Sequence, residues 1–146
     1  MLILHKLYSF TVPVSDLLEV YILYIRSVLE SSAVVWHSSL TVGQELELER
    51  VQKVALKIIL KERYESYDNA LKLCALPSLK DRRIQLCTKF ATKCVKSSKN
   101  NDMFLLKTAV RLTRQPEKFM VTRCNTERLR NSSIPYMQKL LNAKFR

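Results

Sequence analysis

The stretch TVGQELELERVQKVALKIIL (Thr41–Leu60) carries both the start and the buried face of a long helix, around which the rest of the predicted fold is arranged. Thr41 and Gln44 have the spacing of a capping box, so the helix is expected to begin at Val42. Gly43, the only glycine in the sequence, falls in the first turn, where its helix penalty is smallest. Apolar residues at steps of three and four predict a buried stripe of Leu48, Val51, Ala55 and Ile58.

The opposite side of this helix carries a row of basic residues about 16 Å long at 1.5 Å per residue. Cations at successive i, i+4 steps repel one another unless salt screens them or phosphates match them, so the row predicts either a polyanion-binding surface or an ordinary solvated face. The row consists of Arg50, Lys53, Lys57 and Lys61. The acidic trio Glu45, Glu47 and Glu49 is interpreted as helix-end electrostatics, with Glu49 able to pair with Lys53.

Upstream, a second helix is expected from Ser15 to about Trp36. Ser15 can cap it, and Asp16 and Glu19 are favourable in the first turn, at the positive end of the helix dipole. Its residues are apolar on more than one face, which predicts a helix at the centre of the core. Trp36 is interpreted as a core anchor rather than a base-stacking platform, and His37 as structural rather than part of a Cys–His dyad.

Downstream, two further helices are expected. Ser66 can cap a short helix that Pro77 closes. Ser78 with Asp81 repeats the capping pattern and predicts a helix over residues 79–95. One face of this helix is expected to carry Arg83, Cys87, Phe90, Ala91 and Cys94. A second basic row on another face consists of Arg82, Lys89, Lys93 and Lys96.

The remainder of the chain is basic and weakly patterned. Residues 1–96 hold 14 basic and 10 acidic side chains, a net charge of +4, whereas residues 97–146 hold 11 and 3, a net charge of +8. Only IPYMQKLLN (Ile134–Asn142) is helical in pattern there. We therefore expect an all-α fold: a small helical bundle over residues 1–96, then an extended basic C-terminal arm over residues 97–146 that ends in a short helix. The predicted core comprises Trp36, Leu48, Val51, Ile58, Cys87 and Phe90.

The formal net charge of +12 favours a polyanionic partner, because Lys and Arg attract phosphates through counterion release. Non-specific binding to nucleic acid, RNA or DNA, is therefore expected ahead of an anionic membrane surface, and a basic surface that only keeps the protein soluble is the alternative. No signal-peptide pattern is visible, and charges interrupt the most apolar region well short of about 18 residues. The expected location is intracellular, in the cytoplasm or the nucleus.

The sequence predicts no catalytic residue, metal site or cofactor. The four aspartates lie far apart and match no ligand motif for two-metal phosphoryl chemistry. The four cysteines are spaced by 13, 7 and 30 residues, which matches no zinc module. Cys87 and Cys94 are instead expected to be buried, reduced thiols. One glycine cannot form a Gly-rich phosphate loop.

The segment DLLEVYILYIRSVLESSAVVWHSSLTVGQELELERVQKVALKIIL (16–60) resembles the region downstream of the palm in non-LTR (LINE-type, jockey-like) retrotransposon reverse transcriptases. In that family a helix ending in V-W-H or V-W-G precedes an L-E-R-V-Q-K-x-A-L-x-I-I helix. The stretches YESYDNALKLCALPSLKDRRIQLCTKFATKCVKS (64–97) and RLRNSSIPYMQKLLN (128–142) resemble the C-terminal tail of the family. The likeness covers residues 4–142 and is most specific over residues 17–60.

The resemblance implies a helical thumb-and-tail piece that helps a full-length enzyme hold template and growing strand, with the upstream reverse transcriptase domains as partners. The polymerase residues of that family belong to its fingers and palm, and no position here matches their paired-aspartate motif or the endonuclease. Ser31 stands where an aromatic is common, and Lys61 where a Gly commonly ends the helix, which would let the helix continue.

We therefore expect no enzyme activity, but a fragment resembling part of an RNA-directed DNA polymerase, with nucleic-acid binding through the two basic rows and the tail. The alternatives are a helical protein-interaction module and a non-functional retroelement remnant.

Overall fold

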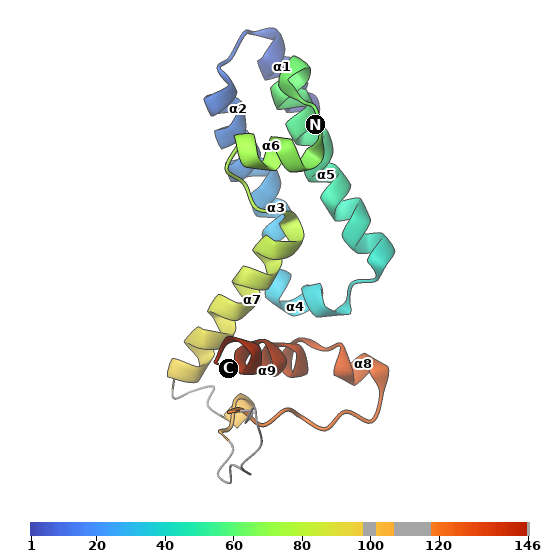
Figure 1. Ribbon diagram of the computed structural model, residues 1–146, viewed down its shortest axis with the longest axis vertical. Coiled ribbons are helices and arrows are strands. Elements are labelled where there is room, and N and C mark those ends of the chain that lie inside the picture. The colour runs from blue at the N-terminus through green and yellow to red at the C-terminus, as the bar shows by residue number, and fades with distance from the viewer. Residues whose placement is uncertain (98–101, 107–117, 146) are drawn as a thin grey trace. The chain divides into compact units, whose positions relative to one another are not determined.

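The computed structural model describes residues 1–97, 102–106 and 118–145, and these residues form an all-α structure, as predicted (Figure 1). Extended pairing among them is limited to one isolated antiparallel bridge between Leu106 and Phe119. None of the described helices is long and apolar enough to cross a membrane. The elements are α1 (Leu2–Ser9), α2 (Val14–Val20), the π-helix η1 (Tyr21–Arg26), α3 (Ser27–Glu30), α4 (Ala33–Trp36), the 3-10 helix η2 (His37–Ser39), α5 (Val42–Leu60), the 3-10 helix η3 (Lys61–Arg63), α6 (Tyr67–Leu73), α7 (Leu79–Lys96), α8 (Glu127–Arg130) and α9 (Ser133–Lys144).

The chain divides into two compact units. The first comprises Met1–Ser31 with Thr41–Arg82, and the second comprises Ser32–Leu40 with Arg83–Arg146. The division therefore falls inside α7, whereas the sequence predicted a boundary after residue 96.

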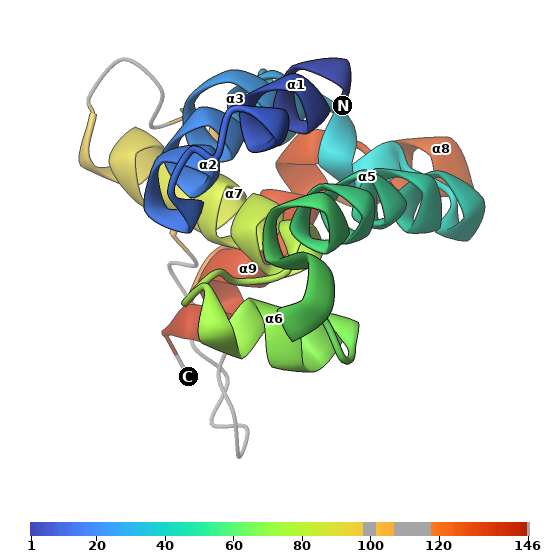
Figure 2. The same cartoon turned by 90° about the horizontal axis from the view of Figure 1, so that it is seen from above.

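The core of the first unit forms on two sides of α5, which lies between α1 and α6 (Figures 1 and 2). One cluster of buried side chains joins α1, α2, η1 and α5: Leu4, Leu17, Tyr21, Ala55, Ile58 and Ile59. A second cluster joins α5 to α6: Leu56, Leu60 and Ala70. Leu48 and Val51, which were predicted to be buried with Ile58, are half-buried. The stripe is therefore buried only along the C-terminal part of α5.

The start of α5 confirms the predicted capping box. The Thr41 side chain accepts a hydrogen bond from the Gln44 N–H at 3.3 Å, and the Thr41 N–H donates to the Gln44 side chain at 3.0 Å. The expectation that this helix continues past residue 60 is wrong, because α5 ends at Leu60 and Lys61 has φ 43° and ψ −107°. A positive φ in a non-glycine residue costs about 1 to 3 kcal/mol. The turn brings Tyr64 onto the cluster between α5 and α6.

The helix expected to begin behind a Ser15 cap begins instead at Val14, after Pro13. The Ser15 hydroxyl donates to the Asp16 carboxylate at 2.8 Å rather than accepting a backbone N–H. Pro13 has φ −56° and ψ 149°, a conformation that sets the direction of the chain as it enters the helix.

The same helix is also interrupted before Trp36. Ser31 is extended, with ψ 126°, and Ser32 is left-handed, with φ 52°. Serine hydroxyls compete for nearby backbone hydrogen bonds, so two serines in succession are a poor continuation of a helix. The predicted helix is therefore divided into a long piece, α2 to α3, and a separate short α4.

Both predicted caps downstream of α5 are present. The Ser66 side chain accepts the Asn69 N–H at 3.2 Å, and the Ser78 side chain accepts the Asp81 N–H at 3.0 Å. The helix predicted over residues 79–95 is α7, which extends one residue further.

The end of α6 is a Schellman turn rather than a stop at Pro77. The Leu76 N–H donates to the Leu71 carbonyl at 2.9 Å, and the Ala75 N–H donates to the Lys72 carbonyl at 3.2 Å. Ala75 has φ 50°, the left-handed conformation that glycine usually provides at this position. The helix therefore ends before the proline is reached.

The core of the second unit joins α7 to α9 and to the residues between them. Its buried members are Cys87, Ala91, Cys94, Phe104, Phe119, Met137 and Leu141. The predicted burial of Cys87 is confirmed, and both thiols of that α7 face are buried and reduced. The predicted burial of Phe90 is wrong, because 44% of its surface is exposed. Arg83, Cys87, Ala91 and Cys94 form the buried face, and Phe90 lies at its margin.

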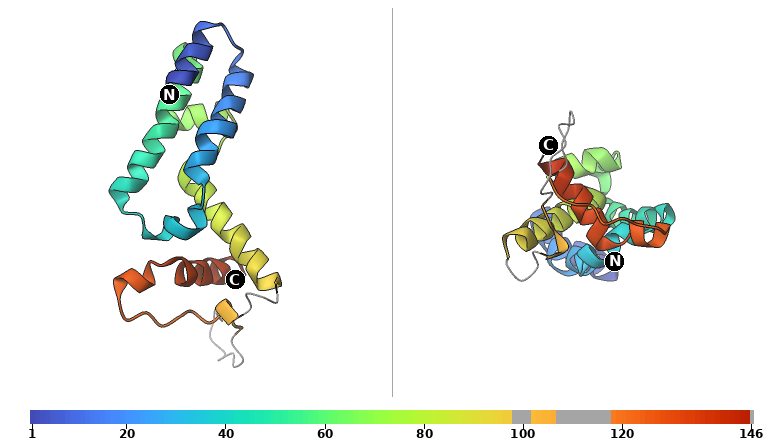
Figure 3. Two further views of the ribbon diagram at one scale, coloured as in Figure 1. Left: turned by 180° about the vertical axis from the view of Figure 1, so that it is seen from behind. Right: turned by 90° about the horizontal axis from the view of Figure 1, so that it is seen from below.

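The described C-terminal residues do not show the predicted basic arm, because the extended chain over residues 118–126 is bound to α9. Two amide side chains of α9 bind the chain that precedes it. Asn142 accepts the Phe119 N–H at 2.8 Å and donates to the Phe119 carbonyl at 3.1 Å. Gln138 accepts the Thr122 N–H and donates to the Met103 carbonyl, both at 2.8 Å. Figure 3 shows this extended chain leading into α8, after which α9 runs back beside it.

Candidate nucleic-acid interface

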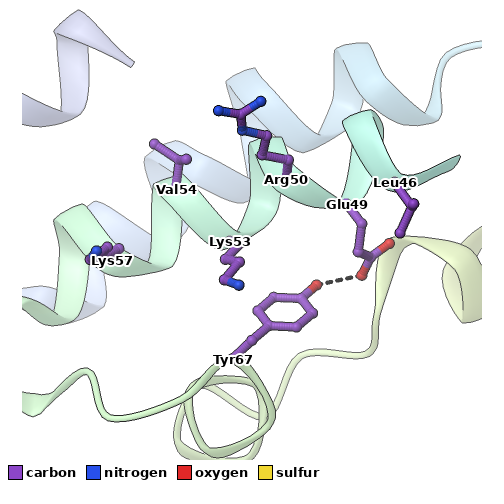
Figure 4. Close-up of a pocket in the computed structure, with 7 residues that line it drawn as sticks. All are labelled: Leu46, Glu49, Arg50, Lys53, Val54, Lys57 and Tyr67. Atoms are coloured by element: carbon purple, nitrogen blue, oxygen red, sulfur yellow. Dashed lines mark hydrogen bonds between the residues drawn. The ribbon is translucent and has the colours of Figure 1, made fainter. Parts of the chain in front are cut away.

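A pocket of about 480 Å³ lies between α5 and α6 in the first unit. Three residues of the first predicted basic row line it, because positions 50, 53 and 57 share one face of a helix. Figure 4 shows these side chains on α5 and Tyr67 approaching from α6. The complete lining is Leu46, Glu49, Arg50, Lys53, Val54, Lys57 and Tyr67.

The fourth residue of that row, Lys61, does not line the pocket. It lies beyond the end of α5, where the chain turns, and its ammonium nitrogen is 3.8 Å from the centre of the Tyr8 ring. A cation over an aromatic face is attracted by the negative charge of that face. The structure therefore groups three of the four basic residues and directs the fourth towards α1.

Two carboxylates lie close to the grouped cations, and neither neutralises them strongly. Glu49 accepts hydrogen bonds from the Leu79 N–H at 3.1 Å and the Lys80 N–H at 3.3 Å. It therefore caps α7, a role that the predicted pairing with Lys53 did not include. Glu47 lies 3.7 Å from Arg50, and both side chains are more than 70% exposed. An ion pair this exposed is worth little, so Arg50 is available to an anionic ligand.

The aromatic member of the pocket is held in place on two sides. The Tyr67 hydroxyl donates a short hydrogen bond to Glu49, which Figure 4 marks with a dashed line. Burial, together with this hydrogen bond, raises the pKa of Tyr67 well above its ordinary value. The ring also packs on the cluster of Leu56, Leu60 and Ala70, while it remains partly exposed to the pocket.

The second predicted basic row has a different environment at each end. Arg82 is half-buried in the first unit, and its Nε lies 3.1 Å from a carboxylate oxygen of Glu30, which also pairs with Arg26 at 3.2 Å. Binding of a phosphate by Arg82 would therefore have to displace a carboxylate. Three exposed residues of α7 belong to the second unit: Lys89, Lys93 and Lys96.

The buried surroundings of His37 agree with a structural role. Arg83 Nε donates to His37 Nδ1 at 3.3 Å, and His37 Nε2 lies 3.2 Å from the Tyr136 hydroxyl. Because a guanidinium only donates, the imidazole carries its hydrogen on Nε2. The predicted burial of Trp36 is wrong, because this residue is half-buried, and its ring lies 5.9 Å from the Arg83 guanidinium.

Two observations bear on nucleophilic and metal chemistry in the described part of the chain. Burial raises the pKa of the Cys87 thiol, which is opposite to the change that activates a cysteine. No three His, Cys, Asp or Glu side chains among the described residues are placed to hold a metal ion. The pocket itself presents three cations, one carboxylate, two apolar side chains and an aromatic ring.

Comparison of the chain with protein-family models, with curated proteins and with solved structures finds no match.

Sequence patterns identified the cations of this pocket but not its other members. Leu46 and Val54 are exposed apolar residues on α5, outside the buried stripe. Tyr67 follows the Ser66 cap, and nothing in the local pattern connects it with a residue of α5. Its position as an aromatic residue in the first turn of a short helix is the signal that the sequence offers.

Proposed function

We propose that this chain is a non-catalytic helical piece that resembles the C-terminal part of an RNA-directed DNA polymerase and binds nucleic acid without reading base sequence. The observation that carries the proposal is the grouping of Arg50, Lys53 and Lys57 around one pocket. The family resemblance supports it, since thumb and tail helices hold nucleic acid in such enzymes.

The charges of the pocket fit a phosphate backbone. Three cations repel one another when they are grouped, and a polyanion relieves this repulsion while it releases its counterions. Glu49 is bound to three hydrogen-bond donors, which offset its negative charge. Lysine and arginine side chains that contact phosphates position a protein on nucleic acid but carry no sequence information.

This proposal is tested by the dependence of binding on sequence and salt. Oligonucleotides with the same base composition in scrambled order should bind the full chain with dissociation constants within about twofold of one another. Affinity should fall steeply as salt rises, because each phosphate contact releases counterions. A tenfold preference for one sequence, or affinity that does not change with salt, would contradict the proposal.

The proposal also includes the absence of polymerase activity. No described cluster of carboxylates can hold the two metal ions that nucleotide transfer uses. Template-dependent incorporation of deoxynucleotides by the purified chain would show that this part of the proposal is wrong.

A helical protein-interaction module is the second candidate, and one observation favours it. The helix from η1 to α3 exposes three large apolar side chains: Leu23 at 63%, Tyr24 at 67% and Val28 at 72%. Exposed apolar residues grouped along one helix are typical of surfaces that contact another protein. This candidate predicts that nucleic acid does not bind even at low salt.

A further inference from the structure

We infer that the pocket between α5 and α6 takes single-stranded nucleic acid, with a base against the Tyr67 ring and the neighbouring phosphates against Arg50, Lys53 and Lys57. This inference rests on the proposed function, and it adds the class of ligand and the residue that selects it. The combination of a basic groove and an aromatic ring is what proteins use to hold single strands.

The Tyr67 ring is suited to stacking because its position is already fixed. Its hydroxyl is bonded to Glu49, and part of the ring packs against Leu56, Leu60 and Ala70. A ring held in this way loses little conformational entropy when a ligand binds. The part of the ring that lines the pocket is an apolar surface on which the face of a base can lie.

The cations are spread along the helix at a suitable interval. From Arg50 to Lys57 the axis of α5 advances by about 10 Å. One nucleic-acid strand carries about one charge for each 3.4 Å of rise, so this length corresponds to about three phosphates. In Figure 4, Lys53 lies between the α5 ribbon and the Tyr67 ring. A nucleotide with its base on the ring would therefore have its phosphate within reach of an ammonium group.

The ring distinguishes single strands from duplexes. In a duplex each base is already stacked between its neighbours, so its face is not available to a side chain. Tyr67 can then contribute only to single-strand binding, whereas the three cations attract the phosphates of either form. The chain should consequently bind a single strand more tightly than a duplex of equal length.

The experiment measures the ratio of two dissociation constants by fluorescence anisotropy, for a labelled thymidine oligonucleotide and for a duplex of the same length, with the full-length chain. Tyr67→Leu removes the ring and should weaken oligonucleotide binding by about 5- to 160-fold, the range for loss of one stacked base. Duplex binding should weaken much less, so the preference for the single strand should fall. Tyr67→Phe keeps the ring and should bind the oligonucleotide more tightly than Tyr67→Leu.

Two controls separate stacking from charge and from folding. Tyr24→Leu makes the same change at an exposed tyrosine outside the pocket and should leave the ratio as it is in the wild type. Heparin is a polyanion without bases, so its affinity for the chain should respond less to Tyr67→Leu than the oligonucleotide affinity does. Circular dichroism at the assay temperature verifies that each variant is folded.

The outcomes distinguish this inference from the proposed function. Equal loss of oligonucleotide and duplex binding in Tyr67→Leu, or no loss of either, would overturn base stacking and leave non-specific binding in place. Binding that is no stronger for the single strand than for the duplex would also overturn it. If neither nucleic acid binds at low salt, the proposed function fails together with the inference.

Discussion

The carboxylate of Glu49 accepts the hydroxyl hydrogen of Tyr67, and through this contact α5 fixes the position of the aromatic ring on α6. The same carboxylate accepts the backbone N–H groups of Leu79 and Lys80 at the start of α7. One side chain thus connects three helices of the first unit. A negative charge at a helix N-terminus is stabilising, so Glu49 contributes to stability and to the shape of the pocket together.

Replacement of this carboxylate should destabilise the protein. Glu49→Gln removes the negative charge that faces the start of α7 and weakens the bond from Tyr67, and we expect a loss of about 1 to 2 kcal/mol in the free energy of unfolding. Urea denaturation measures this free energy of unfolding. Glu47→Gln is the matched control, because Glu47 is exposed and pairs only weakly with Arg50, and it should change stability by less than about 0.5 kcal/mol. Equal effects of the two substitutions would show that the Glu49 contacts contribute nothing.

Stability should fall at alkaline pH because of two tyrosines. Burial raises the pKa values of Tyr21 and Tyr67 in the folded chain above their ordinary value of about 10. Both hydroxyls then stay protonated in the folded state while they ionise in the unfolded state. Their contribution to the free energy of unfolding is therefore fully present below about pH 10 and is lost as the pH rises above that value.

An ultraviolet titration of tyrosine ionisation tests this expectation. Tyr21 and Tyr67, two of the six tyrosines of the chain, should resist ionisation until the protein unfolds. Tyr67→Phe should have one resistant tyrosine fewer than the wild type. Ionisation of all six near pH 10 in the folded protein would contradict the buried environment of both residues.

Relief of backbone strain should stabilise the end of α6. Ala75→Gly places glycine at φ 50°, where it is not strained, and should raise the free energy of unfolding by about 0.5 to 1 kcal/mol. Ala143→Gly makes the same change at an exposed helical position of α9 and should lower stability by about the same amount. Thermal unfolding distinguishes the two directions, and a loss of stability in Ala75→Gly would argue against the Schellman turn.

Two phenylalanines of the second unit should differ in their contribution to its core. Phe119 is 1% exposed, so Phe119→Ala should cost about 3 to 5 kcal/mol. Phe90 is 44% exposed, and Phe90→Ala should cost about 1 kcal/mol because much of its apolar surface is already in water. Chemical denaturation of the two variants compares them directly. A larger loss of unfolding free energy for Phe90→Ala than for Phe119→Ala would show that Phe90 is buried, as the sequence predicted.

The sequence predicted those features of the fold that depend on neighbouring residues. The capping box of Thr41 and Gln44 and the Ser66 cap involve residues three apart, so the local pattern contains all the information. The end of α5 could not be predicted in this way. Lys61 adopts a positive φ because the chain must turn there for Tyr64 and α6 to pack on α5, and a lysine gives no local sign of that requirement.

The candidate site was predicted only in part, for a similar reason. Helical periodicity places Arg50, Lys53 and Lys57 on one face, so their grouping follows from spacing alone. Tyr67 joins them through packing of α6 on α5, which no periodicity within either helix specifies. Arg82 was grouped with the lysines of α7 by spacing, and its contact with Glu30 depends on a helix 52 residues away.

The salt dependence of nucleic-acid binding by Lys57→Gln and Lys6→Gln tests most sharply whether α5 contacts the nucleic acid. Both variants lose one positive charge, but Lys57 lines the pocket, whereas Lys6 is exposed on α1 and does not. In a titration of a single-stranded oligonucleotide, the slope of log affinity against log salt should become shallower by about 0.7 to 1 in Lys57→Gln and remain that of the wild type in Lys6→Gln. Equal slopes for all three proteins would remove α5 from the binding surface and contradict the account.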